Sequence, residues 1–219
     1  MPPAIVVLIS GRGSNMRAIV ERSREPPQPY RVALVLCDRP AALGLRIARD
    51  LGVASRALPA GPSESRAVYD RALAAAIDEF GPSLIVLAGF MRILSPEFVA
   101  HYAGRILNIH PSLLPKYPGL HTHRRVLAAH ERVHGATVHF VTEELDGGPP
   151  IIQARVSVVP GEDEAALAAR VQAQEHVIYP LAVSWYCQGR LRCRGGRAWL
   201  DGAALTAPVL YGDNQARGQ

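Results

Sequence analysis

Residues 108–119 read Asn108-Ile109-His110-Pro111-Ser112-Leu113-Leu114-Pro115-Lys116-Tyr117-Pro118-Gly119. Asn108 and His110 stand two residues apart, and an extended backbone points side chains at that spacing to one face. The prolines that follow exclude a helix and cannot donate backbone hydrogen bonds to a sheet. The stretch therefore predicts a strand at 106–110 that ends in a rigid loop carrying polar groups.

Around this strand, apolar runs alternate with helical patterns. Buried strands are expected at residues 4–10, 32–37 and 84–88, with a weaker candidate at 55–58. Helices are expected at 14–24, 43–51, 63–80, 96–102 and 163–188. Later strands, antiparallel in one arrangement, are expected at 137–142 and 151–158, and a closing hairpin at 190–194 and 198–200. The alternation predicts a single α/β domain with a twisted, mostly parallel sheet flanked by helices and a Rossmann-like N-terminal half.

Composition limits the class of protein. With 219 residues and 48% hydrophobic content, the chain is long enough for one domain with a full core. It has no apolar run of about 20 residues, the length of a membrane span, and no signal-peptide pattern at its N-terminus. Three cysteines without a CxxC pair fit reduced thiols better than disulfides. We therefore expect a cytoplasmic protein that does not contact a membrane.

The positive charge of the chain is compatible with two kinds of partner. The net charge of +5 comes from scattered arginines, apart from a cluster at 190–197, and aromatic residues make up only 6%. A nucleic-acid surface would show a basic stripe with aromatic residues between. Attraction of small anionic substrates is the simpler interpretation, so we expect no nucleic-acid partner.

Three side chains form a plausible acyl-transfer site. Asn108 can stabilise an oxyanion, and His110 can move protons near neutral pH. Asp146, which precedes two glycines, can orient the histidine or raise its pKa. Each also has an ordinary structural interpretation, because strand-end histidines and Asp-Gly turns are common in proteins.

The segment Gly11-Arg12-Gly13-Ser14-Asn15 lies between an expected strand and an expected helix. Its glycines allow a ligand to approach the backbone, and the N–H groups at the helix start favour an anion such as phosphate. The dinucleotide fingerprint is incomplete because Met16 replaces the third glycine, although Asp38 stands where a ribose-binding acid would. A nicotinamide-type site and a turn without a ligand therefore stay open here.

Other polar residues are less specific. His121 and His123 stand two residues apart, but no cysteine or carboxylate completes a recognisable metal-ligand set, so we expect no metal and place them in a loop near the substrate. Glu175 falls on the apolar side of the last helix, where a carboxylate is costly unless it is paired. It is expected to meet an arginine or a substrate amine.

Four separated motifs resemble the phosphoribosylglycinamide formyltransferases, a family of folate-dependent enzymes of purine synthesis. They are 9–15, 89–95, 108–119 and 144–148, in the family's order and at its spacing. The resemblance implies the formyltransferase fold over residues 1–200, with a phosphate-binding half at about 1–105, a folate and catalytic half at about 106–200, and a C-terminal tail at 201–219. It also leads us to expect a cis bond between Leu114 and Pro115.

The resemblance implies transfer of the formyl group of 10-formyltetrahydrofolate, the co-substrate, to the amine of glycinamide ribonucleotide. Asn108 and His110 would stabilise the oxyanion, and Asp146 would raise the pKa of His110. The residues implied for the ribonucleotide are Gly13, Ser14, Asn15, Gln172 and Glu175. The residues implied for the folate are Arg66, Met91, Arg92, Ile93, Leu94, Asn108, Thr142, Glu143, Glu144 and Leu145. Arg12 departs from the asparagine expected at its position.

Two other functions remain as alternatives. A sister enzyme with the same folate site, a formyl-folate hydrolase or a methionyl-tRNA formyltransferase, would carry a further domain for which 219 residues leave no room. A nucleotide-binding module or oxidoreductase built on the glycine loop would leave Asn108, His110 and Asp146 unexplained. The sequence is compatible with a homodimer but does not decide the oligomeric state.

Overall fold

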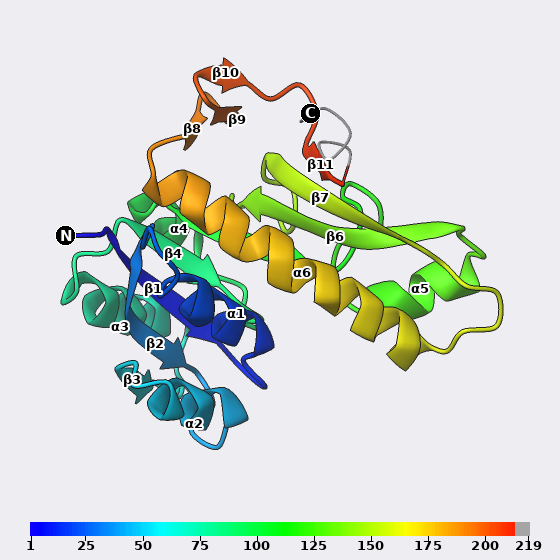
Figure 1. The fold of residues 1–219 in the computed structure, drawn as a ribbon. Coiled ribbons are helices and arrows are strands. Elements are labelled where there is room, and N and C mark those ends of the chain that lie inside the picture. The colour runs from blue at the N-terminus through cyan, green and yellow to red at the C-terminus, as the bar shows by residue number, and fades with distance from the viewer. Residues whose placement is uncertain (213–219) are drawn as a thin grey trace.

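An eight-stranded sheet forms the centre of the computed structural model, which describes residues 1–212 (Figure 1). The strand order is β11-β7-β6-β5-β4-β1-β2-β3. The strands are β1 (Ala4–Ile9), β2 (Arg31–Cys37), β3 (Ser55–Ala57), β4 (Leu84–Leu87), β5 (Ile106–His110), β6 (Val133–Phe140), β7 (Pro150–Ser157) and β11 (Val209–Tyr211). Strands β1 to β5 are parallel, and β6 runs antiparallel to both β5 and β7. The mostly parallel α/β sheet predicted from the sequence is confirmed.

Helices cover both faces of the sheet (Figure 1). They are α1 (Ser14–Arg22), α2 (Leu43–Asp50), α3 (Arg66–Asp78), α4 (Pro96–His101), α5 (Thr122–Ala128) and α6 (Glu164–Cys187). Alternate residues of β1 enter two different cores. Ile5, Val7 and Ile9 pack with α1, α2 and α6, whereas Val6 and Leu8 pack with α3 and α4. Because both faces of β1 are buried, its sequence is a continuous apolar run.

Three of the differences from the prediction have a clear physical cause. α3 begins at Arg66 and not at residue 63, because the Ser65 side chain accepts a hydrogen bond from the Val68 N–H and caps the helix there. β6 begins at Val133, four residues earlier than expected, since residues 133–136 pair with β7, a contact that depends on tertiary structure. Residues 122–128 form the short helix α5 and not a loop; only Thr122 and Val126 of this helix are buried, so it has no strong apolar pattern.

The C-terminal part of the described chain forms two structures. β8 (Leu191–Arg194) and β9 (Arg197–Leu200) make the predicted hairpin, and β10 (Ala203–Ala204) extends it to a three-stranded sheet. β11 then returns to the main sheet and pairs in parallel with β7. No helix within residues 1–212 is long and apolar enough to cross a membrane.

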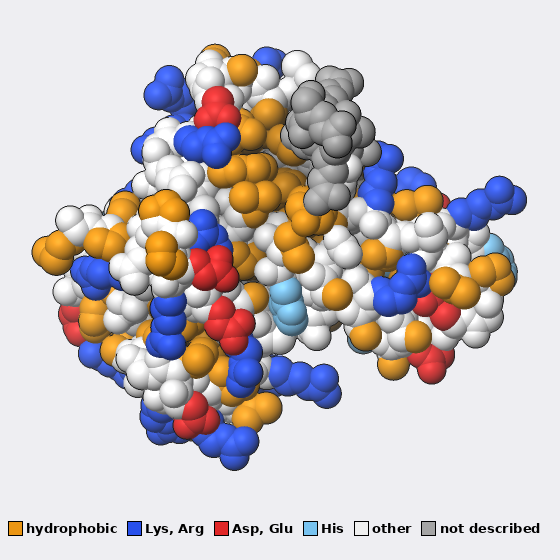
Figure 2. All heavy atoms as spheres, viewed as in Figure 1, with side chains coloured by type: hydrophobic (Ala, Val, Ile, Leu, Met, Phe, Trp, Pro, Cys, Tyr) orange, Lys and Arg blue, Asp and Glu red, His pale blue; other side chains and the backbone are white. Residues whose placement is uncertain are grey.

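The outer surface carries mixed charge. Figure 2 shows Lys and Arg side chains distributed around the visible face, with apolar side chains gathered between them.

The carboxyl ends of the parallel strands β1, β4 and β5 lie at one edge of the main sheet. In open α/β sheets, ligands bind at this edge.

Candidate active site

His110 is the last residue of β5, and its side chain is buried. Its Nε2 lies 2.9 Å from the carbonyl oxygen of Tyr117, and because a carbonyl only accepts, this nitrogen carries the proton. On the other side of the ring, Nδ1 lies 3.4 Å from Oδ2 of Asp146. The imidazole is therefore held between a backbone carbonyl and a carboxylate.

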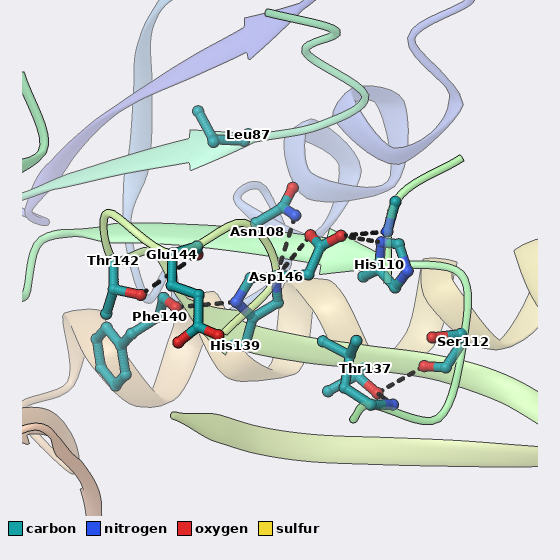
Figure 3. A network of polar contacts seen from close by, with 12 residues as sticks. Leu87, Asn108, His110, Ser112, Thr137, His139, Phe140, Thr142, Glu144 and Asp146 are labelled. Atoms are coloured by element: carbon teal, nitrogen blue, oxygen red, sulfur yellow. Dashed lines mark hydrogen bonds and ion pairs between the residues drawn. The ribbon is translucent and has the colours of Figure 1, made fainter. Parts of the chain in front are cut away.

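Asp146 connects three segments of the chain (Figure 3). Its own backbone has a φ of 53°, a conformation that aspartate tolerates better than most residues. Its Oδ2 accepts a hydrogen bond of 2.8 Å from the Gly119 N–H, while the same carboxylate faces His110. Its Oδ1 lies 3.8 Å from Nε2 of His139. The carboxylate is therefore held in one orientation by the loop that follows β5.

Asn108 lies two residues before His110 on the same strand, as the sequence predicted, and Nδ2 of its amide lies 3.1 Å from Nε2 of His139. In Figure 3, the side chains of Asn108, His110 and Asp146 converge on one region above β5 and β6. An amide, an imidazole and a carboxylate in this arrangement can stabilise negative charge on a carbonyl oxygen and move a proton beside it.

The proline-rich loop that follows β5 is held in place by hydrogen bonds to Thr137 of β6. The Thr137 hydroxyl donates to the Ser112 carbonyl at 2.6 Å and accepts from the Leu114 N–H at 3.1 Å. Gln153 donates to the Leu114 carbonyl at 2.8 Å. The bond between Leu114 and Pro115 is cis, as expected from the resemblance. These contacts hold the loop that supplies the Tyr117 carbonyl to His110.

The glycine loop joins β1 to α1. Gly13 is the N-cap residue of α1 with a φ of 75°, and no side chain caps the helix there. The N–H groups of its first turn are therefore oriented for an anion. A Cβ atom on Gly13 would lie 2.9 Å from the Cα of Gly44, so this glycine also lets α1 and α2 approach closely. Sequence reasoning missed this second role, because Gly44 is distant in sequence.

Glu175 of α6 is buried and accepts a hydrogen bond of 2.7 Å from the side-chain amide of Asn15. Burial raises the pKa of the Glu175 carboxyl, and the Asn15 hydrogen bond opposes that shift. Of the two expected partners, an arginine is not the one that Glu175 meets within the described residues, since its side-chain partner is Asn15; the contact with a substrate amine stays a prediction. Gln172 lies one turn earlier on α6 and is exposed.

Comparison with known proteins identifies the family. A family model described as formyl transferase matches residues 4–183. The phosphoribosylglycinamide formyltransferase of Escherichia coli (strain K12) is 55% identical over 201 residues, which are 92% of this chain and 95% of that protein. The solved structure of the Coxiella burnetii phosphoribosylglycinamide formyltransferase superposes with a TM-score of 0.91 at 44% identity, covering 96% of this chain and 100% of that one. This chain belongs to the phosphoribosylglycinamide formyltransferases. A glycinamide ribonucleotide transformylase from Symbiobacterium toebii superposes with a TM-score of 0.87 at 43% identity, covering 91% and 94% of the two chains.

The segments that the resemblance to this family assigned to the folate are largely exposed. Met91, Ile93 and Leu145 have 60%, 61% and 59% of their surface exposed, an unusual degree for apolar side chains. The Met91 N–H donates to the Ser10 hydroxyl at 2.8 Å, which ties this segment to the end of β1. Thr142, Glu143 and Glu144 precede Leu145 in the loop after β6. Leu94 and Val141, the residue before Thr142, both pack against the core on the α3 and α4 side of the sheet.

Two predicted folate residues are arginines with different surroundings. Arg66 is the first residue of α3 and is exposed to solvent. The guanidinium of Arg92 lies over the ring of Tyr69, 4.0 Å from its centroid. Arg92 is therefore positioned by a cation–π contact.

The histidines after the proline-rich loop belong to α5 and its cap. His121 is the N-cap residue, and His123 lies in the helix with Nδ1 3.0 Å from Nε2 of His134. Among residues 1–212, no three His, Cys, Asp or Glu side chains are grouped to hold a metal.

His139 was missed by sequence reasoning. Its only sequence signal is that it lies in a predicted strand, and its partner Asn108 depends on the β5–β6 register.

Proposed function

We propose that the protein transfers the formyl group of 10-formyltetrahydrofolate to the primary amine of glycinamide ribonucleotide, a step of de novo purine biosynthesis. The observation that carries the proposal is the convergence of Asn108, His110 and Asp146 at the carboxyl end of β5. It is supported by 55% identity to the Escherichia coli phosphoribosylglycinamide formyltransferase over nearly its whole length.

The ribonucleotide binds at the glycine loop in this proposal. Its phosphate accepts hydrogen bonds from backbone N–H groups of Gly13, Ser14 and Asn15 at the start of α1. Glu175 and Gln172 of α6 hold the remainder of the ribonucleotide. Residues of about 1–105 then form the phosphate-binding half of the domain, and residues of about 106–200 the folate and catalytic half.

In this proposal the folate binds on the side of the reacting groups that is opposite to the ribonucleotide. Its pteridine lies against the backbone of Met91, Arg92, Ile93 and Leu94 and the loop from Thr142 to Leu145. The exposed apolar side chains of these two segments would be covered by the ligand, which accounts for their exposure. Arg66, which is exposed, pairs with a carboxylate of the glutamate tail.

The reaction needs no nucleophile from the protein. The lone pair of the substrate amine attacks the formyl carbon, a new C–N bond forms, and the carbonyl pair moves to oxygen. The tetrahedral intermediate collapses when the bond from carbon to N10 of the folate breaks. N10 then gains one proton and the former amine loses one. Holding both substrates in one cleft supplies much of the rate.

The site residues act on the charge that develops at oxygen. An N–H of Asn108 donates to the oxyanion. His110 donates as well once the formyl oxygen replaces the Tyr117 carbonyl as acceptor for Nε2; such contacts often tighten only when substrate is bound. Asp146 stabilises the imidazolium from the Nδ1 side and routes protons through water.

The assay that tests the function mixes the protein with 10-formyltetrahydrofolate, with and without glycinamide ribonucleotide, and follows deformylated folate. Product that requires the ribonucleotide is expected. Equal rates in both mixtures would indicate a hydrolase, and no product in either would overturn the proposal.

Asp146→Asn tests the site. It keeps the shape of the side chain but removes its charge, so kcat should fall by about 100- to 10,000-fold. The dissociation constants of both substrates should change little, because the contact matters most in the transition state. Unchanged turnover in a folded variant would show that residues 144–148 form only a turn.

A further inference from the structure

His139 occupies a position next to the reacting groups that none of the roles above requires. In the β5–β6 register it stands directly opposite Asn108, and its side chain is 3% exposed. Its ring touches Asn108 through Nε2 and the carbonyl of Phe140 through Nδ1 (Figure 3). Because the ring is buried and both of its nitrogens make contacts, it can constrain the orientation of the groups that it contacts.

The Phe140 contact determines where the proton of His139 sits. Nδ1 lies 2.9 Å from the Phe140 carbonyl oxygen, and since a carbonyl only accepts, Nδ1 must carry the hydrogen. Burial lowers the pKa of His139, which outweighs the opposing effects of the Phe140 hydrogen bond and Asp146. The ring is therefore neutral, and Nε2 presents a lone pair.

A lone pair at Nε2 accepts only from a donor, and this decides the orientation of Asn108. At 3.1 Å, the group of Asn108 that faces Nε2 must be the amide NH₂ and not the amide oxygen. In Figure 3 the amide oxygen of Asn108 points away from His139. One N–H of Asn108 is thereby engaged, and the second N–H remains for a ligand.

We propose that His139 is a positioning residue that fixes the orientation of the Asn108 amide, so that an N–H and not the amide oxygen faces the formyl oxygen. The inference rests on the proposed formyl transfer. With the amide reversed, an oxygen lone pair would face the developing oxyanion and oppose it. His139 acts through Asn108 and does not touch the reacting atoms.

Two substitutions at His139 separate the contribution of Nε2 from that of Nδ1. Gln can place its amide oxygen near the position of Nε2, where it accepts from Asn108. Asn is shorter and can keep only the donor that meets the Phe140 carbonyl. We expect His139→Gln to keep kcat within about fivefold of the unsubstituted protein, and His139→Asn to lose about 10- to 100-fold, with KM for both substrates little changed. Equal losses in both variants, or no loss in His139→Asn, would overturn the proposal.

A double-substitution cycle distinguishes positioning from general structural damage. In an Asn108→Ala background the amide is gone, so His139→Asn should cause no further loss of kcat. An undiminished second loss would mean that His139 supports the site in another way, and the proposal would be wrong.

A measurement that does not use the reaction completes the test. In protein labelled with ¹⁵N-histidine, the Nε2 shift of His139 should be that of an unprotonated nitrogen and Nδ1 that of a protonated one. Protonated Nε2 would overturn the orientation of Asn108. This result holds whether or not formyl transfer is detected, so failure of the proposed function and failure of this inference are distinguishable.

Discussion

Glu175 and Asn15 share a single buried hydrogen bond between helices α6 and α1. The carboxylate is almost fully covered, and Oδ1 of Asn15 is buried without a hydrogen-bond partner among residues 1–212. Burying an ionised carboxylate against one neutral donor is unfavourable. A stable core would not favour this arrangement, whereas the substrate amine proposed to bind here would compensate the buried charge.

Replacing Glu175 with glutamine should therefore stabilise the protein near neutral pH. Because the pKa of Glu175 is raised in the folded state from its ordinary value of 4.5, the folded state loses stability as pH rises above 4.5. Glu175→Gln removes that loss, and we expect a gain of about 0.5–2 kcal/mol at pH 8 that shrinks below pH 4.5. Denaturant unfolding of both proteins at pH 4 and pH 8 measures this gain.

The same variant should bind the ribonucleotide more weakly, because it lacks the carboxylate proposed to face the substrate amine. A stability gain of the same size at pH 4 and pH 8 would contradict the ionisation argument. Unchanged ribonucleotide affinity would remove Glu175 from the binding site.

At the scale of an element, the loop between β6 and β7 places Asp146 against His110, and its two glycines have unequal roles. A Cβ atom on Gly147 would lie 2.4 Å from a side-chain atom of Glu144, which is exposed and can move away. A Cβ atom on Gly148 would lie 1.9 Å from the backbone oxygen of Phe140, which cannot move without disturbing β6. The second glycine therefore sets how closely the loop approaches the strand.

This difference predicts that alanine is tolerated at one position and not at the other. Gly147→Ala should keep kcat within a fewfold of the unsubstituted protein. Gly148→Ala should displace Asp146 from His110, and a displacement of about 1 Å is enough to lower kcat by roughly 100-fold. Steady-state kinetics on the matched pair measures the difference. Similar losses in both variants would show that Asp146 does not depend on the contact between Gly148 and β6.

At the scale of the whole molecule, the sequence predicts the structure best where the environment of a residue follows from residues close to it in the sequence. β1 is an example, since its unbroken apolar run requires cover on both faces. The glycine loop, Asn108 and His110 follow from local spacing. Their partners Gly44 and His139 do not, because contacts across sheets and between helices depend on register and packing. α5 and β11 were missed because each is short and is ordered by tertiary contacts.

The neighbouring histidines His123 and His134 are expected to make the folded molecule sensitive to acid. Burial, and then the neighbouring His123, lower the pKa of His134 from 6.5 to about 4. Burial also lowers the pKa of His123, which packs edge-on against His134. Between pH 6.5 and 4 the unfolded chain therefore binds more protons than the folded protein, so stability present above pH 6.5 is lost as pH falls toward 4.

His134→Gln should flatten this pH dependence, because glutamine can still meet His123 but does not titrate. Free energies of unfolding measured from pH 7 down to pH 4.5 should fall less steeply in the variant than in the unsubstituted protein. At pH 7 the variant should be the less stable of the two, since the packed ring is lost. The two curves should therefore converge or cross on acidification. Curves that stay parallel over the whole range would show that other groups, and not the His123–His134 pair, cause the acid sensitivity.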